Sequence, residues 1–348
     1  MDAVSPAFSV LAIVSILAVT GLLAVIEKRV TRGDLARIVL VAGVGGSIVA
    51  LAGFLEVLVL PRLLFGPVVA LGALFATLAT SLLEYESTRR RLALAAASTA
   101  LVFLPIAVAV LGTTFDPFGT RLGVIDLGGA VPTLVGGGAV ALGVALLRRH
   151  PKVATGNRIR RWTVFIPGIL VWIAGVGWLV GLELAADDMV PIIVVSALVM
   201  PAAAAVAASV VERLRFGRTT AFGIIPGLLA GIAAAVPACA FVTAPLAAMI
   251  GLVVGAVSGV LPYRVRRWSA VTLAVGAAIS TVLIGAVGTN IGYIYTGQPE
   301  LILGQLSITL LAAAGGVALG VATGWSFRRW PSSGSQRPVG SERTLPRR

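Results

Sequence analysis

The sequence predicts an all-α integral membrane protein: a bundle of eleven transmembrane helices, formed by a 5+5 inverted repeat and one C-terminal helix. Three observations predict it. The chain is 58% hydrophobic and 12% charged, with a mean hydropathy of +1.02, which leaves too little polar surface to cover a soluble globule of this length. Eleven apolar stretches divide the chain, and the arginines and lysines gather in every second gap between them.

The basic residues predict the direction of each crossing. All but two of the 27 lysines and arginines lie in alternate gaps or in the tail, and the two exceptions are Arg62 and Arg121. Loops that face the cytoplasm carry the Lys/Arg excess, so we expect the amino terminus outside a prokaryotic cytoplasmic membrane and the carboxyl terminus inside. The net charge of +13 would suggest nucleic acid in a soluble protein. Here the charge comes from the Lys/Arg excess of the cytoplasmic loops, and no nucleic-acid partner is expected.

Each apolar stretch is close to the roughly 20 residues that a helix needs to cross a hydrocarbon core of about 30 Å. The alternating pattern of a membrane barrel is absent, so helices are expected throughout. The first stretch is expected to remain as a helix, because its basic cluster follows the apolar run, whereas in a cleaved signal peptide it precedes the run. The predicted spans are 4–26, 38–60, 64–83, 92–112, 127–147, 162–183, 189–211, 219–237, 243–262, 269–289 and 302–326.

The organisation of the spans suggests two halves. The longest inside loop, Arg148 to Arg161, separates five spans from the next five and leaves one at the end, as in transporters built from inverted repeats. We therefore expect a transmembrane domain over 1–330. A basic tail over 331–348, rich in Pro, Ser, Gly and Arg, is expected to be disordered and cytoplasmic.

Three stretches resemble the ammonium transporter (Amt/Rh) family. The segment 81–84, followed by an arginine-rich turn and then by 104–107, resembles the third and fourth helices of that family, where a glutamate precedes a basic turn and a proline breaks the next helix. The segment 122–129 is similar to the leucine-aspartate and glycine-glycine entry into the fifth helix. The segment 217–223, continuing through 237–242, resembles the eighth-to-ninth helix signature. The resemblance implies eleven spans in the bilayer, a homotrimer, and passage of ammonium or ammonia.

The chain departs from that family at the pore. Family members carry two facing pore histidines, but this chain has a single histidine, His150, in an inside loop. By the resemblance, the first pore position falls at Leu134, or at Thr133 if one residue is deleted before the glycine pair. The second falls near Ala278. The resemblance thus implies a degenerate member without the twin histidines.

The outer mouth departs as well. The resemblance puts one gating phenylalanine at Ala70 and the tryptophan of the outer cation site at Leu111. No phenylalanine lies between Phe165 and Phe216, where the second gate belongs. The groups that would bind and gate an ion are therefore replaced.

Two acids within or beside the spans need an interpretation. Asp126 heads the fifth span, where an aspartate is favoured as a helix N-cap that accepts bonds from Leu127 to Gly129; a functional acid is the alternative. Glu56, near the outer end of the second span, is either a functional intramembrane acid or a side chain that reaches the headgroups. The expected pore-lining candidates are Ala70, Leu111, Asp126, Thr133, Leu134, Ala278 and Thr281.

The sequence gives no support for an enzyme, a cofactor or a metal site. Ser280 and Thr281 lie in a span without a histidine or lysine to activate them, and no catalytic residue is assigned. The single cysteine, Cys239, cannot form an internal disulfide, and with one histidine a zinc site is implausible. Nothing in the sequence supports a cytoplasmic regulator either.

Two functions remain open. The first is a channel or transporter that passes ammonium, ammonia or another small neutral solute through a pore with degenerate residues. The second is a non-transporting membrane sensor or assembly protein that retains the fold. A row of small or polar residues through the centre of the bundle would favour the first, and a centre plugged by Leu, Val or Phe would favour the second.

Overall fold

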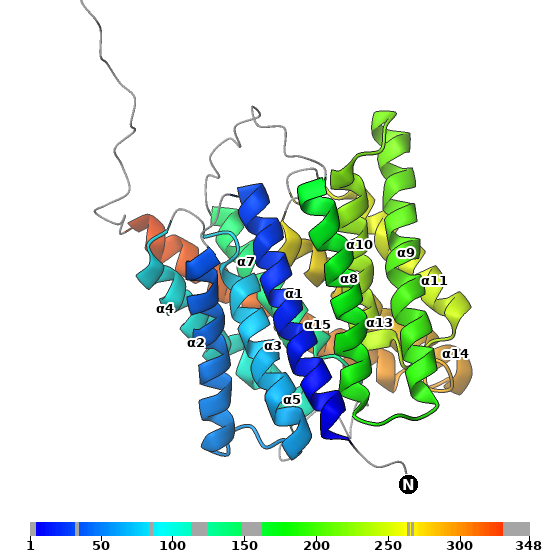
Figure 1. Ribbon diagram of the computed structural model, residues 1–348, viewed down its shortest axis with the longest axis horizontal. Helices are drawn as coiled ribbons and strands as arrows, with labels where there is room; N and C mark the ends of the chain where they lie inside the picture. The colour runs from blue at the N-terminus through cyan, green and yellow to red at the C-terminus, as the bar shows by residue number, and fades with distance from the viewer. Residues whose placement is uncertain are drawn as a thin grey trace, which may run out of the picture.

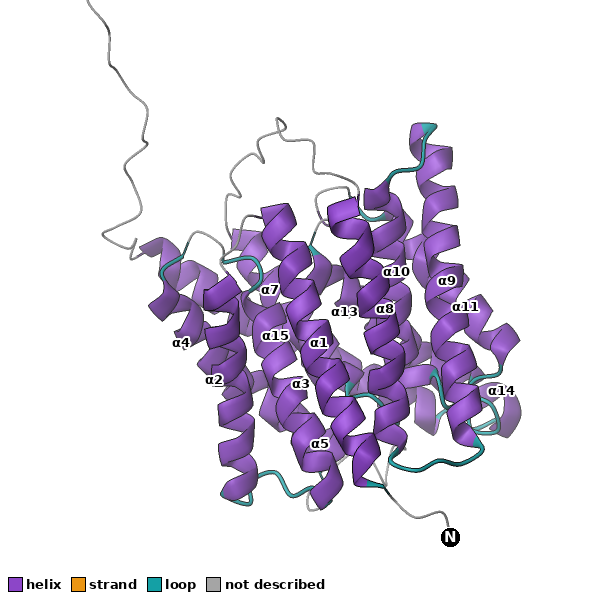
Figure 2. Cartoon of the chain, in the orientation of Figure 1, coloured by secondary structure: helices purple, strands orange, loops and turns teal. Residues whose placement is uncertain are grey.

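The computed structural model describes residues 5–31, 35–83, 86–112, 124–147, 162–262, 265 and 268–329. All regular secondary structure within these ranges is helical (Figures 1 and 2). The positions of His150 and Arg121 and the predicted tail lie outside the described residues.

Eleven helical spans are found in the described ranges. Eight helices are long and apolar enough to cross a membrane, and three shorter apolar helices complete the set. The elements are α1 (Pro6–Thr31), α2 (Leu35–Phe54), α3 (Arg62–Thr80), α4 (Thr88–Ser98), η1 (Thr99–Phe103), α5 (Leu104–Leu111), η2 (Val131–Val135), α7 (Gly136–Leu147), α8 (Trp162–Glu183), α9 (Met189–Phe216), α10 (Ala221–Ala238), α11 (Ala244–Val260), α13 (Ser269–Val287), α14 (Tyr293–Thr296) and α15 (Glu300–Arg329). The segments α4, η1 and α5 form the fourth span, and η2 with α7 forms the fifth.

Several predicted boundaries are wrong by a few residues, and the second span shows why. The predicted span ran to residue 60, but α2 ends at Phe54 and the chain turns through Glu56, which has φ +57°. Hydropathy continues across the turn because the residues on both sides of Glu56 are apolar. Glu56 is exposed beyond the end of the helix, which fits the headgroup interpretation.

The helix contacts repeat between the two halves of the chain. In the first half α3 packs on α1, α2, α4 and α7, and in the second half α10 packs on α8, α9, α11 and α13 in the corresponding order. The two halves meet where α1 lies along α8 and where η2 and α7 lie along α13. Figure 1 shows the first set on one side of the molecule and the second on the other. Five spans reverse the direction of the chain, so the two halves are inverted with respect to each other. The predicted fold is confirmed.

The last helix, α15, covers the junction of the two halves by packing along α7 and α13. The helices approach closely because small residues meet. A Cβ atom at Gly143 would overlap the carbonyl oxygen of Val317, and one at Gly255 would overlap that of Ala204. Such small-residue contacts replace the hydrophobic driving force that helices lack within lipid.

Two spans contain a wide π-helical turn beside a proline. The segment η1 comes just before Pro105, and η2 contains Pro132. Proline has no N–H to donate to the preceding turn, and π turns in helices are frequent at functional sites. The second of these turns lies at the centre of the bundle.

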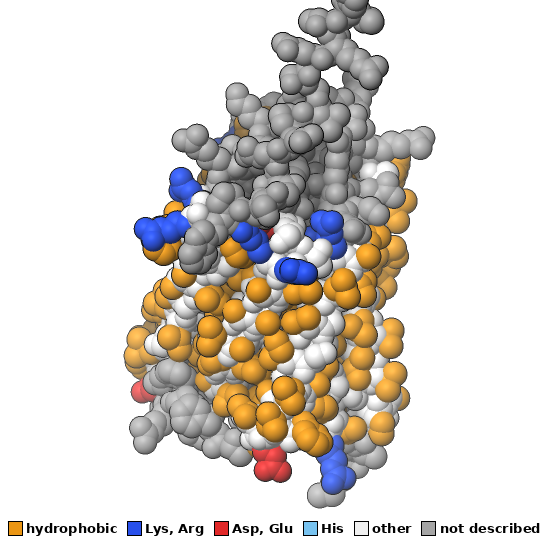
Figure 3. Space-filling view, turned by 90° about the vertical axis from the view of Figure 1, so that its left-hand side faces the viewer, with side chains coloured by type: hydrophobic (Ala, Val, Ile, Leu, Met, Phe, Trp, Pro, Cys, Tyr) orange, Lys and Arg blue, Asp and Glu red, His pale blue; other side chains and the backbone are white. Residues whose placement is uncertain are grey.

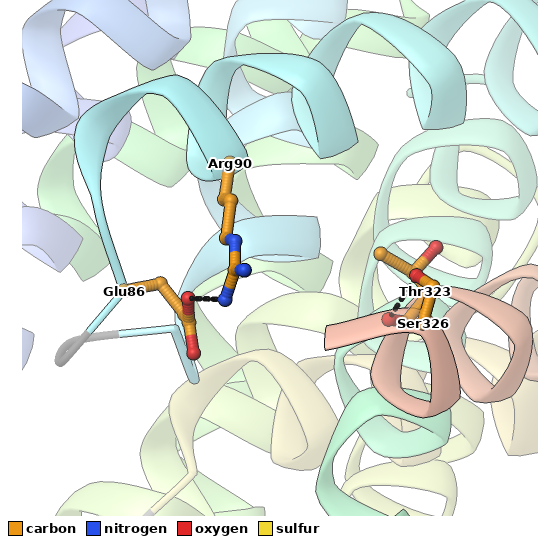
Figure 4. Close-up of polar contacts among 4 residues, drawn as sticks. All are labelled: Glu86, Arg90, Thr323 and Ser326. Atoms are coloured by element: carbon orange, nitrogen blue, oxygen red, sulfur yellow. Dashed lines mark hydrogen bonds and ion pairs between the residues drawn. The ribbon is translucent and has the colours of Figure 1, made fainter. Parts of the chain in front are cut away.

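The two ends of the bundle differ in charge. Figure 3 shows an apolar band with most of the visible lysine and arginine side chains at one end and acidic side chains at the other. At the basic end, Arg90 donates to Glu86 at 2.9 Å (Figure 4). The Arg90 guanidinium also lies 5.1 Å from the centre of the Phe327 ring, which links α4 to the end of α15.

Candidate functional site at the junction of the two halves

Asp126 stands at the entry to the fifth span. Its Oδ1 accepts a hydrogen bond from the Ala130 N–H at 2.7 Å, and its Oδ2 accepts one from the Val131 N–H at 2.8 Å. These donors lie further along than the expected Leu127 to Gly129, because the chain first makes a turn and the helix begins at residue 130. The Asp126 carboxylate therefore caps the fifth span with both of its oxygens.

The glycine pair lets this entry lie against the second half of the chain. Gly128 donates its N–H to the carbonyl oxygen of Val236 in α10 at 3.1 Å. A Cβ at Gly128 would stand 2.9 Å from the same oxygen, and Gly129 has φ +69°, which disfavours other residues. Gly128 is thus required by the close approach to α10, and Gly129 by the backbone conformation of the turn.

The pore positions implied by the family resemblance lie on η2 and α13, which pack against each other. Gly138 of α7 lies against Ala274 of α13. The fifth and tenth spans cross in opposite directions. Leu134 lies one helical turn before Gly138, and Ala278 lies one turn after Ala274, so Leu134 and Ala278 lie at the same depth. Leu134 and Thr133 are fully buried, and the Thr133 hydroxyl has no hydrogen-bond partner among the described residues.

Apolar side chains fill the α3 side of this level. Phe75 of α3 is fully buried, lies against Gly136 and Gly137, and packs on Phe103 of η1 with the ring centres 5.3 Å apart. Ala70 is buried on the same helix. Leu111, half-buried at the end of α5, approaches the entry at Gly129.

The α15 side is polar. Thr281 is fully buried and its hydroxyl has no partner among the described residues. One turn further along α13, Gly285 lies against Ile302 of α15, so Thr281 lies at the depth of Gln305. The Gln305 Nε2 donates to the Ile125 carbonyl oxygen at 2.7 Å, while its Oε1 has no described partner. Thr309, one turn on, also has an unpartnered hydroxyl.

Sequence reasoning missed Gln305 and Thr309. The available signal was a pair of polar residues four apart, hence on one helix face, near the start of an otherwise apolar span. The structure thus places Thr133 and Leu134 on η2 and Ala278 and Thr281 on α13, two elements that pack together at the junction, with Ala70 on α3 and Leu111 at the end of α5.

This level holds no charged side chain other than Asp126 among the described residues. The remaining buried charged residues, Glu86, Arg91 and Glu212, lie at the ends of helices. Apart from Asp126, the described residues of the junction offer only uncharged hydroxyl and amide groups, which suit a neutral molecule better than a bare ion that has lost its hydration. An inverted repeat of membrane-spanning helices with a polar junction at its centre is the architecture of many transporter folds.

The family is settled by the sequence match. The profile of the Ammonium Transporter Family matches residues 44–325, and the chain belongs to this family. No curated protein matches the chain.

Solved structures show the same fold. The chain is similar to a structure named Sensor Amt Protein, with TM-score 0.78, 17% identity and 93% of each chain covered. It is also similar to Saccharomyces cerevisiae Mep2, with TM-score 0.82, 18% identity, and 95% of this chain and 89% of that one covered. For Candida albicans Mep2 the TM-score is 0.76 at 17% identity, with 94% and 83% covered. The family resemblance read from the sequence is confirmed.

Proposed function

We propose that this protein passes a small neutral solute, with ammonia as the first candidate, and does not carry ammonium as an ion. Membership of the family points to transport without enzymatic chemistry. The proposal rests on the polar groups of the junction. Thr133 and Thr281 supply unpartnered hydroxyls there, and no described residue supplies an imidazole that could accept a proton. Both oxygens of Asp126 are already bonded to backbone N–H groups.

The energetics separate the ion from the neutral molecule. A charge at the centre of a bilayer costs at least about 2.5 kcal/mol even on the most permissive scales, and an isolated ion loses far more where no group replaces its water. A hydroxyl can donate one hydrogen bond and accept up to two, which suits ammonia or water. The candidate path runs past Ala70, Leu111, Asp126, Thr133, Leu134, Ala278 and Thr281.

Two measurements on the same proteoliposomes test this. Stopped-flow recording with an internal pH dye should show a protein-dependent ammonia influx, while ammonium pulses on a solid-supported membrane should give no protein-dependent current. Thr133→Val, which keeps the shape and removes the hydroxyl, should slow the influx. A saturable ammonium current would refute the proposal and direct the search for a proton acceptor to Glu56, Asp126 or Thr281.

A second function is favoured by a different observation. Leu134 of η2 and the neighbouring Phe75 and Phe103 are all fully buried, which suits a closed, non-transporting protein used for sensing or assembly. In that case the wild-type protein gives no influx, and Leu134→Ala or Phe75→Ala creates one.

The topology and assembly belong to the same proposal. With the basic end of the bundle in the cytoplasm, the amino terminus lies outside, and we propose a homotrimer in which 1–330 forms the membrane domain and 331–348 a cytoplasmic tail. Reporter fusions after Arg161 and after Arg348 should report cytoplasm, and a fusion within 183–189 should report the outside. A tail outside the cell would overturn this topology.

A further inference from the structure

A second site lies away from the junction, at the acidic end of the bundle. A cavity of about 560 Å³ is lined by the first turns of α9, by the α10–α11 connection and by the turn after α13. This volume falls within the roughly 300–1,000 Å³ typical of sites that hold small molecules. In Figure 1 it belongs to the lower right of the molecule, where α9 begins and α14 lies.

The cavity walls are tied together by hydrogen bonds. The Ser196 hydroxyl of α9 donates to the Val242 carbonyl oxygen at 3.2 Å, and the Thr289 N–H donates to the Phe241 carbonyl oxygen at 2.7 Å. All four residues line the cavity. These bonds hold α9 and the end of α13 against the same connection, so the hollow is part of the fold.

The cavity opens at the surface of the bundle beside α9. Ile192 and Val195 line it and are also 41% and 44% exposed on the lateral surface of α9. Next to the cavity, α14 exposes Tyr293 and Tyr295, and tyrosines gather where the hydrocarbon meets the headgroups. We therefore expect the mouth of the cavity at the headgroup level of one leaflet.

The rim is polar and acidic. Asn290 lines the cavity at this edge, and Asp187 and Asp188, which do not line it, immediately precede the lining residue Met189, whose N–H is bonded to Asp187. Carboxylates at the rim repel an anionic headgroup and attract an ammonium group. The lining below the rim is mostly aliphatic and aromatic, which suits an acyl chain.

From this arrangement we propose that the cavity binds a phospholipid with an amine-bearing zwitterionic headgroup, such as phosphatidylethanolamine, from the leaflet at the acidic end. One acyl chain lies between α9 and the α10–α11 connection, and the ammonium group lies by Asp187 and Asp188. The site is separate from the junction, so this proposal stands whether or not ammonia passes.

Native mass spectrometry of the delipidated protein tests the proposal, with palmitoyl-oleoyl phosphatidylethanolamine and phosphatidylglycerol added back in turn. The first should bind more tightly than the second. Val195→Trp, which fills the mouth of the cavity, should weaken that binding by about tenfold because the chain loses its apolar contacts. Leu198→Trp is the matched control, since Leu198 is equally exposed on α9 at 45% but does not line the cavity.

The headgroup is tested separately. Asp188→Asn should reduce the preference for phosphatidylethanolamine over phosphatidylglycerol while leaving thermal stability unchanged, because Asp188 is exposed. The proposal is overturned if Val195→Trp and Leu198→Trp bind both lipids as the wild type does. It is also overturned if Val195→Trp changes the oligomer mass and leaves lipid binding unaltered, since a second copy of the chain would then occupy the cavity.

Discussion

Two buried acids stand at opposite ends of the bundle and are satisfied in different ways. Asp126 lies four and five residues before the N–H groups that it binds, so it caps its own helix. Glu212, at the end of α9, reaches the next helix: its Oε2 accepts from the Thr220 N–H at 2.8 Å and its Oε1 from the Thr220 hydroxyl at 2.9 Å. A buried carboxylate here thus stabilises a helix start, either locally or across a connection.

The difference predicts unequal costs of removal. Around Asp126 the bonded N–H groups belong to fully buried residues, whereas Thr220 is half-exposed and can turn to water. Local capping in a dry site is therefore expected to contribute more than capping across a connection at the surface.

The largest effect is expected for Asp126→Ala. Two buried N–H groups lose their acceptor, at on the order of 1–3 kcal/mol for each, so the melting temperature in detergent should fall clearly. Asp126→Asn keeps one acceptor oxygen, so its melting temperature should fall less. Glu56→Ala, a change of an exposed acid at the same end, is the control. If both Asp126 variants were as stable as the wild type but lost ammonia influx, the capping role would be wrong.

A smaller effect is expected for Glu212→Ala, on the order of 1 kcal/mol, because water can replace the carboxylate at Thr220. Glu212→Gln retains an acceptor oxygen, so its melting temperature should lie between those of Glu212→Ala and the wild type. Combining Glu212→Ala with Thr220→Ala should cost less than the sum of the two, since they remove one shared interaction. Strict additivity of the two melting-temperature shifts would contradict the proposed pairing.

Effects of similar or smaller size should separate Gln305 from Thr309. Gln305→Leu loses the bond to Ile125, which anchors the segment just before Asp126, at about 1 kcal/mol. Thr309→Val removes an unpartnered hydroxyl and should leave stability unchanged or raise it. If Thr309→Val instead lowers the melting temperature, a bound water or solute satisfies that hydroxyl, which extends the polar junction to α15.

Hydropathy and charge were sufficient to predict the spans, because burial in lipid requires long apolar helices. They could not find the end of α2, where the turn at Glu56 interrupts an apolar run. The cap at Asp126 was predictable from a local preference. Gln305 was not, because its partner Ile125 lies 180 residues away in the chain. Glu212 depends in the same way on a helix that follows it, and only packing brings such partners together.

The π turn in η2 has an evolutionary consequence. A π turn holds one more residue than an α turn for nearly the same advance along the axis. A lineage can therefore gain or lose one residue between Gly129 and Gly136 without shifting the capped entry or the glycine contacts below it. Such a change would rotate the intervening side chains by about a quarter of a turn and exchange which of Thr133 and Leu134 faces α13. A one-residue indel could thus exchange a hydroxyl at the junction for a hydrocarbon side chain, or reverse that change, with the capped entry at Asp126 retained.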